Sequence, residues 1–243
     1  SLYLETFYAG ASTYMGKLGQ QVASDQLSIY DDGPVAGMAA SKAITDEGLP
    51  TGRTDLIREG KLAGLLANYY EYQRIRHDPK ATEKLGMDPR QLAQAIAPRN
   101  GFRTGRGGGR NFDSPPGTTP TNLIIEGREK LSNQELLRRV GDGLYIGRIW
   151  YTYPVNGMGA GDFSGTIVGD SYIIKDGRIA APIRPNTLRM NENIHNIFNK
   201  VLGIGAEQVG TVRWASDQVT WAPEVAVEDF HLQEIGGYME QLV

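Results

Sequence analysis

The stretch from Gly143 to Ile183, GLYIGRIWYTYPVNGMGAGDFSGTIVGDSYIIKDGRIAAPI, decides the fold class. Its apolar runs are rich in β-branched and aromatic residues, which suit a pleated, half-buried sheet. The runs 144–153 and 166–174 predict strands, and the glycines of 156–161 predict a turn or bulge between them. Asp176-Gly177 is a tight-hairpin signal, because glycine adopts positive φ at low cost. We therefore expect antiparallel sheet, with a further strand after this hairpin.

The composition fits one large domain or two small ones, since the chain has 243 residues of which 40% are hydrophobic. It contains 31 glycines without a repeat period, which favours many turns and excludes collagen. A net charge of −3 gives no strong field for nucleic acid or an anionic membrane. Cysteine is absent, and no apolar run is long enough to span a bilayer. We expect a cytoplasmic protein; the start at Ser1 rather than Met suggests a processed or truncated chain.

Two helices are predicted clearly outside the central stretch. Ser132 and Glu135 have capping-box spacing, which predicts a helix over 132–140. Apolar residues share one face of a second predicted helix over 191–202, which Asn191 or Asn193 caps and Gly203 ends.

The remaining segments are mostly strands and turns. Strands are expected from Leu27 and over 121–126, and the Glu59-Gly60-Lys61 break favours a strand over a helix for 62–72. Residues 77–100 are helical in character, with Pro89 at a first helical position after Asp88. The predicted fold class is therefore α+β, mainly antiparallel β-sheet with a few helices.

A glycine- and arginine-rich loop, which contains GRGGGR at 105–110, is the one candidate binding segment. Its arginines Arg103, Arg106 and Arg110 and its glycine amides suit an anion. It lacks the Lys-Ser/Thr ending of a P-loop. A solvated surface loop and a loop that borders a peptide cleft are the other two interpretations.

No catalytic or metal-binding set is predicted. His77, His195 and His231 lack ligand spacing, which favours surface or packing roles. The adjacent carboxylates Asp31-Asp32 and Asp46-Glu47 are typical of solvated turns, and Ser164 lacks the spacing of a nucleophile elbow.

The order of several short motifs resembles the TldD/PmbA family, the metallopeptidases once called modulators of DNA gyrase. The series runs YMGKLGQQVAS (14–24), DDG (31–33), DEG with a later Pro (46–50), LIREGKLAGLL (56–66), Thr121-Asn122 and Glu126-Gly127, GLYI, GDFSG (161–165) and IIKDGRIAAPI (173–183). Each motif alone is weak, whereas the ordered set covers nearly the whole chain. The resemblance is to the C-terminal half of those proteins, so residues 1–243 are expected to form that C-terminal domain.

The resemblance implies a barrel-like sheet domain, a homodimer or a heterodimer with a homologous subunit, and peptide or unfolded polypeptide substrates. TldD-type members hold zinc with a HExxxH helix and a downstream Cys. The helix would fall at or before Ser1, and the Cys would fall near 214–216, where this chain has none. The chain therefore resembles the metal-lacking PmbA/TldE-like side of the family, and no cofactor is expected in it unless an upstream HExxxH brings zinc.

Three functional hypotheses follow. The leading one is a domain that forms a peptide-binding cleft and a dimer interface without its own metal site. The second is part of an active zinc metallopeptidase whose HExxxH lies upstream, and the third is an anion-binding module that uses the loop. The apolar N-terminal residues, among them Leu2, Leu4 and Phe7, either form a contact surface or pack on their own domain.

Overall fold

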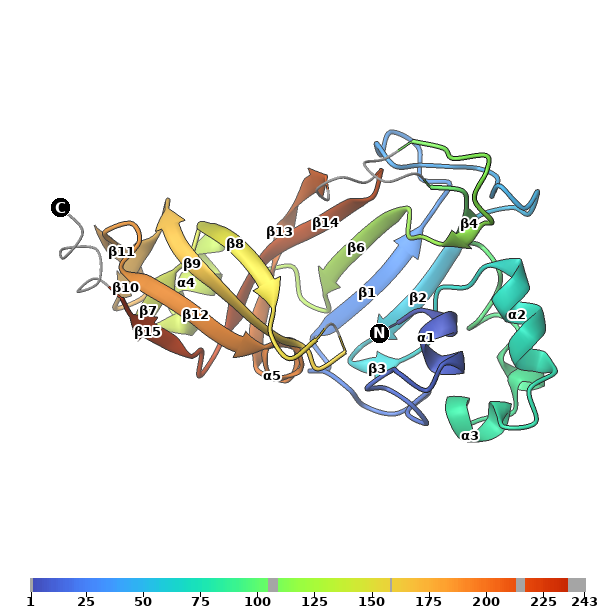
Figure 1. Ribbon diagram of the computed structural model, residues 1–243. Coiled ribbons are helices and arrows are strands. Elements are labelled where there is room, and N and C mark those ends of the chain that lie inside the picture. Colours follow the sequence, from blue (N-terminus) through green and yellow to red (C-terminus); the bar gives the residue numbers. More distant parts are fainter. Residues whose placement is uncertain (1, 105–108, 158, 213–216, 236–243) are drawn as a thin grey trace. The chain divides into compact units, whose positions relative to one another are not determined.

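The computed structural model describes residues 2–104, 109–157, 159–212 and 217–235 (Figure 1). The chain forms two compact units, Ser1–Arg128 with Glu207–Pro223, and Glu129–Ala206 with Glu224–Val243. Strands dominate both units and the helices are short, so the α+β class is confirmed. The sheets formed by the described residues are open, with an end strand on each side, so the barrel-like arrangement is not supported.

The first unit is built on a sheet in the order β13-β14-β6-β1-β2-β3, in which residues 201–206 of β13 and 224–227 of β14 belong to the second unit (Figure 1). β1 pairs antiparallel with β2 and β6, and β14 pairs parallel with β6. The strands expected from Leu27 and over 121–126 are confirmed. The bounds are β1 (Leu27–Asp32), β2 (Arg53–Arg58), β3 (Lys61–Leu62), β6 (Asn122–Gly127), β13 (Val201–Val212) and β14 (Val219–Val227), with the short pair β4 (Gly101–Phe102) and β5 (Gly117–Thr118) beside them.

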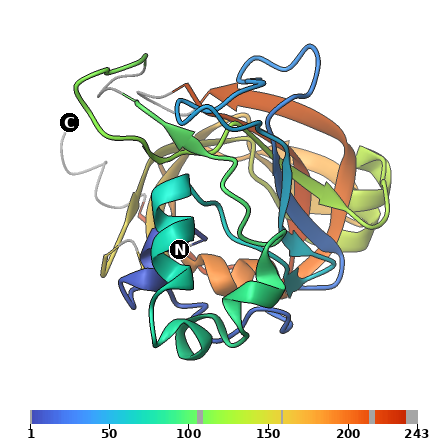
Figure 2. The same ribbon diagram turned by 90° about the vertical axis from the view of Figure 1, so that its right-hand side faces the viewer.

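Short helices pack together in the same unit (Figure 2). They are α1 (Leu4–Tyr8), α2 (Tyr69–Arg76), α3 (Ala81–Leu85) and the 3-10 helix η1 (Pro89–Leu92). Leu4 and Phe7 of α1 are fully buried with Ile75 and Leu85. The apolar N-terminal residues therefore belong to the core of their own unit, and the interpretation of them as a contact surface is wrong.

The segment 62–72 corrects the predicted strand. The Glu59-Gly60 hairpin is present, with φ of 47° and 75°, but β3 ends at Leu62. Asn68 then caps α2, since its side-chain oxygen accepts a hydrogen bond from the Glu71 amide at 2.7 Å. This cap outweighs the strand signal because it satisfies one of the unpaired donors of the first helical turn.

In the second unit each of the two long predicted strands is interrupted, and the parts before and after the break belong to different sheets. The run 144–153 divides into β7 (Gly143–Tyr145) and β8 (Arg148–Pro154), and the run 166–174 follows β9 (Asp162–Gly169) with β10 (Tyr172–Lys175). β7 and β10 pair in one sheet, β8 and β9 in the other. At the shared corner the Gly147 amide donates to Ser171 Oγ at 3.2 Å, and a Cβ on Gly147 would lie 2.1 Å from the Asp170 carbonyl oxygen.

The other elements of this unit follow the hairpin signal and the caps. Asp176 and Gly177, with φ of 50° and 68°, join β10 to β11 (Arg178–Pro182). Helix α4 (Asn133–Val140) has the expected capping box of Ser132 and Glu135. The predicted helix 191–202 is too long, because Leu188–Asn193 forms β12, α5 covers only Ile194–Asn199 and β13 begins at Val201. Asn193 is the cap, and β15 (Leu232–Glu234) completes the unit.

A buried carboxylate ties β1 to two distant segments of the first unit. Asp31 is 1% exposed; it accepts hydrogen bonds from Asn100 Nδ2 at 2.7 Å and from the Thr121 amide at 2.6 Å. Burial raises the pKa of Asp31 to about 6, although these hydrogen bonds act in the opposite direction. Asp31 was expected in a solvated turn; instead it organises the centre of the unit.

We expect Gly60→Ala to destabilise the chain by about 3 kcal/mol, and Gly48→Ala by about 1 kcal/mol. Both glycines have positive φ, 75° and 79°. A Cβ on Gly60 would lie 2.3 Å from the Ala23 carbonyl oxygen and 2.6 Å from that of Ser24, whereas a Cβ on Gly48 meets no atom within 4 Å. Urea unfolding measures both variants, and equal losses would show that the backbone contact is unimportant.

The free energy of unfolding should fall by about 2–3 kcal/mol as pH rises from about 4 to above 6, because Asp31 binds its proton more tightly folded than unfolded. In Asp31→Asn this slope should disappear. Denaturant titrations across pH 4–7 compare the slopes, so a change in absolute stability does not affect the result. An unchanged slope in the variant would exclude Asp31 as its source.

Candidate functional site

The candidate site is the four-stranded sheet of the second unit, in the order β15-β12-β9-β8 (Figure 1). Among the described residues β8 pairs only with β9, which makes it an end strand. Its side chains Ile149, Trp150, Tyr151 and Tyr153, here called the aromatic edge, are exposed. Trp150 is 66% and Tyr151 73% exposed, which is unusual for rings of this size. An exposed apolar end strand is typical of a contact surface.

A bulge shapes the aromatic edge. The β8–β9 register shifts between Trp150 and Tyr153, and Tyr151 has φ of 54°. The Tyr151 ring lies 6.4 Å from the Trp150 ring and 6.0 Å from the Tyr153 ring, measured between centroids. Beneath the bulge, a Cβ on Gly165 would lie 2.8 Å from Ile149 Cγ2. Gly165 of the GDFSG motif thus leaves room for the bulge, and Ser164 is buried and donates to Asn191 Oδ1 at 2.9 Å.

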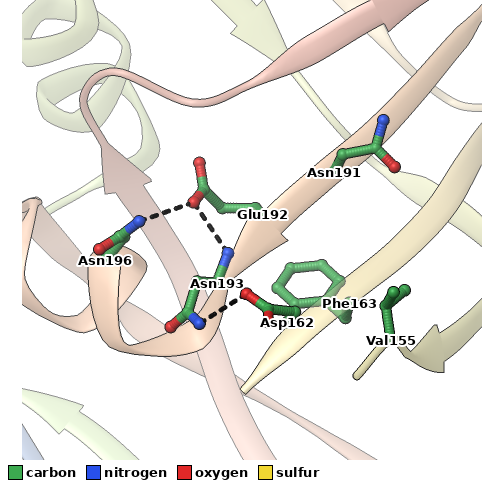
Figure 3. A pocket seen from close by; sticks show the side chains of 7 residues that line it. All are labelled: Val155, Asp162, Phe163, Asn191, Glu192, Asn193 and Asn196. Carbon is green, nitrogen blue, oxygen red and sulfur yellow. Dashed lines mark hydrogen bonds between the residues drawn. The ribbon is translucent and has the colours of Figure 1, made fainter. Parts of the chain in front are cut away.

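A pocket of about 300 Å³, most of whose lining residues are polar, lies at the end of the same sheet (Figure 3). It is lined by Val155, Asp162, Phe163, Asn191, Glu192, Asn193 and Asn196. Asp162 accepts hydrogen bonds from Asn193 Nδ2 at 2.8 Å and from Asn156 Nδ2 at 3.2 Å, and both lower its pKa. Since the Val155 amide donates to the Asp162 carbonyl oxygen at 2.8 Å, the pocket directly continues from the end of β8.

Glu192 is the buried anion of this pocket. Its carboxylate accepts from the Asn193 amide at 2.8 Å, from Asn196 Nδ2 at 3.2 Å and from the His231 amide at 3.2 Å, and it lies 2.8 Å from His231 Nδ1. Burial alone would raise its pKa, but these partners outweigh burial and lower it to about 2. Glu192 therefore fixes the start of α5 and the segment before β15 as an ion.

The predicted arginines of the loop have different partners. Arg103 donates from its guanidinium to the carbonyl oxygens of Phe112 and Ser114, at 3.0 and 2.7 Å. Arg110 lies 3.2 Å from Asp46 Oδ1, and the Arg103 amide donates to Asp46 Oδ2 at 2.8 Å. Asp46 therefore joins these two arginines, while Arg106 lies outside the described residues.

Sequence reasoning missed the roles of the carboxylates in turns. Asp46 accepts from the loop, and Glu47 accepts a hydrogen bond from the Tyr69 amide at 2.8 Å. They bind backbone donors rather than solvating a turn. No local sequence signal indicates these partners, because the Arg103 and Tyr69 amides are 57 and 22 residues away along the chain.

The zinc site of the TldD-type members was compared with the residues that the structure describes. Within the described ranges, no group of three or more His, Cys, Asp or Glu side chains is placed to hold a metal ion. His231 pairs with Glu192, and the positions expected for the family Cys, 214–216, are outside the described residues. No described helix is long and apolar enough to cross a bilayer.

Residues 1–234 match the model of the PmbA/TldA metallopeptidase C-terminal domain, and the chain belongs to this family. It is 28% identical over 220 residues to a metalloprotease of Synechocystis sp., covering 90% of this chain and 36% of that protein. It is 27% identical over 183 residues to the metalloprotease TldD homolog of Buchnera aphidicola (Acyrthosiphon pisum), covering 74% and 31%.

Solved structures agree with the fold. TldE from Thermococcus kodakarensis superposes with a TM-score of 0.71 at 17% identity, over 95% of this chain and 45% of that one. A protein of Thermotoga maritima, described as a candidate modulator of a DNA gyrase, gives 0.70 at 22% identity, over 96% and 45%. The chain thus spans about a third of the length of these curated relatives and less than half of these structures.

We expect Glu192→Gln to lower stability at neutral pH by about 2–3 kcal/mol, because the buried acceptor loses its charge while its donors remain. Since the folded pKa is depressed, the wild-type contribution is complete above about pH 4.5 and is lost as pH falls toward 2. Thermal unfolding from pH 2 to 7 should show this acid loss in the wild type and a flatter curve in the variant. Parallel curves would contradict it.

Proposed function

We propose that this chain is the C-terminal domain of a TldD/PmbA-like protein of the peptidase family, and that it forms a peptide-binding cleft and a dimer interface without a metal site of its own. The observation that carries the proposal is the aromatic edge on the end strand β8. The proposed domain extends over residues 1–243, and a cytoplasmic location accords with the absence of cysteine.

The end strand supports binding of an extended polypeptide. A peptide can add to a sheet edge through main-chain hydrogen bonds, which demand little of its sequence, so an unfolded polypeptide is a suitable substrate. The rings of Trp150, Tyr151 and Tyr153 would cover alternate apolar side chains of that peptide. Where β8 ends, the pocket beside Val155 and Asp162 offers carboxylate and amide groups to the peptide backbone.

The same unit supports pairing with a second subunit. Ile173 of β10 and Ile179 of β11 are exposed, and β11 is the end strand of its sheet among the described residues. Open apolar edges are the usual route by which two sheets join. A homodimer and a heterodimer with a homologous subunit both satisfy this chemistry, and nucleic acid and membrane are not proposed as partners.

The alternative is an active zinc metallopeptidase whose HExxxH lies upstream of this chain. The names of the relatives, metalloprotease and metalloprotease TldD homolog, favour it. In both versions the residues described here bind and orient the peptide, and no chemical step is assigned to them. The sequence of the parent gene upstream of Ser1 separates the two versions directly.

Trp150→Ser should weaken binding of an extended peptide about tenfold or more, because it removes a large exposed ring from the aromatic edge. The probe is an apolar heptapeptide with an acetylated amino end and an amidated carboxyl end, measured by titration calorimetry. Val225→Ser is the matched control, since it removes an exposed apolar side chain from β14, outside both the aromatic edge and the proposed dimer interface.

Equal affinity of the wild type and Trp150→Ser for the blocked peptide would contradict the cleft.

For assembly, light scattering from micromolar to high micromolar concentration should show a dimer of the wild type. A strictly monomeric mass, in the absence and presence of the homologous subunit, would contradict the interface.

A further inference from the structure

The glycine- and arginine-rich loop is a hairpin in the part that the structure describes. β4 and β5 pair at its base, where Gly101 is opposite Thr118 and Phe102 opposite Gly117. Further out, Thr104 bridges to Arg110 and the Asn111 amide donates to the Arg103 carbonyl oxygen at 2.9 Å. The hairpin thereby presents two adjacent donors of fixed position, the Gly109 amide and the Arg110 guanidinium.

Both donors are occupied by carboxylates of the chain itself. The Gly109 amide donates to Asp217 Oδ2 at 3.0 Å, and the Arg110 guanidinium lies 3.2 Å from Asp46 Oδ1. Gly109, Arg110 and Asp217 are exposed. Two neighbouring residues that each hold a carboxylate oxygen form a carboxylate-binding arrangement, since backbone amides and guanidinium groups are the preferred partners of such oxygens.

The two internal carboxylates are held with different strength. Asp46 is largely buried: its side chain is 13% exposed, it also accepts from the Arg103 amide, and its own amide donates to the Gly101 carbonyl oxygen at 2.9 Å. Asp217 is exposed and makes one described hydrogen bond to the hairpin. Asp46 is therefore a fixed part of the site, and Asp217 is the group that a ligand from solution can displace.

We propose that the Gly109 amide and Arg110 bind the carboxylate of a peptide, and that Asp217 occupies this site as an internal competitor. One ligand oxygen takes the place of Asp217 Oδ2, and the other accepts from Arg110, which has five N–H donors in total. The ligand is a free C-terminus or an Asp or Glu side chain. The inference rests on the proposed function, because it assigns a substrate class to the peptide.

Arg103 is not part of this site. Its guanidinium holds the carbonyl oxygens of Phe112 and Ser114, so its function is to fix the shape of the hairpin. Of the three arginines predicted to bind an anion, only Arg110 belongs to this site among the described residues. The Gly109 amide is its second donor.

The test uses three acetylated pentapeptides that differ only in one carboxylate. The first is a pentaalanine with a free C-terminus, the second is its C-terminal amide, and the third is the amide with one central Glu. Titration calorimetry measures their binding to the wild type, Asp217→Ala and Asp217→Asn, and to Asp217→Ala combined with Arg110→Ala. Thermal unfolding checks that each variant is folded.

Removal of Asp217 should increase affinity for a carboxylate peptide about tenfold and leave affinity for the plain amide unchanged, because a charge-assisted hydrogen bond no longer has to be displaced. Asp217→Asn should lie between, and adding Arg110→Ala should abolish the preference for carboxylate. The free-acid and Glu peptides show whether a C-terminus or an acidic side chain is the better ligand.

Two results would overturn the inference: equal binding of the acid and amide peptides by Asp217→Ala, or no binding of either carboxylate peptide. Neither result bears on the cleft at β8, which is tested with a peptide blocked at both ends and the Trp150→Ser variant. The failure of one proposal is thus distinguishable from the failure of the other.

Discussion

One buried carboxylate determines how the first unit is assembled. Asp31 lies on the central strand β1, and its partners Asn100 and Thr121 are 69 and 90 residues further along the chain. Those partners flank the hairpin that carries Arg103 and Arg110, so the carboxylate fixes where the hairpin leaves the sheet. Burying an ion is costly unless donors surround it, and the amide and hydroxyl of Thr121 supply that compensation. The position of the loop thus depends on an interaction in the core.

The same principle recurs at the acidic pair Asp46-Glu47. Asp46 accepts a hydrogen bond from the Arg103 amide, and Glu47 accepts one from the Tyr69 amide. Each joins two segments that have no common sheet. In a fold with many short strands, a carboxylate that binds backbone donors performs the connecting function that a longer helix or strand would otherwise provide.

Short sequence motifs correctly predicted the elements that are stabilised by interactions between neighbouring residues. The capping box at Ser132 and the Asp176-Gly177 hairpin follow from contacts within a few residues, and both are present. The corner at Gly147 and Asp170 was not predictable, since a change of sheet depends on which distant strand offers a partner. Likewise, β8 is an end strand only because of the order of strands in its sheet. The sequence therefore does not distinguish its aromatic residues from those of an inner strand. The loop arginines were visible in the sequence, but the internal acids that occupy Arg110 and Gly109 come from distant positions.

The parallel pairing of β14 with β6 has a consequence for how the chain folds while it is being synthesised. Val219 is opposite Asn122, and the whole of Glu129–Ala206 lies between the two strands in sequence. At a synthesis rate of about 5–20 residues per second, β6 waits for this partner for roughly 5–20 s after it is made. During that interval Leu123 and Ile125 flank an unpaired edge, while the second unit has time to form its own hairpins. A nascent chain stalled before residue 219 should therefore depend on a chaperone to protect β6 from pairing with the wrong strand.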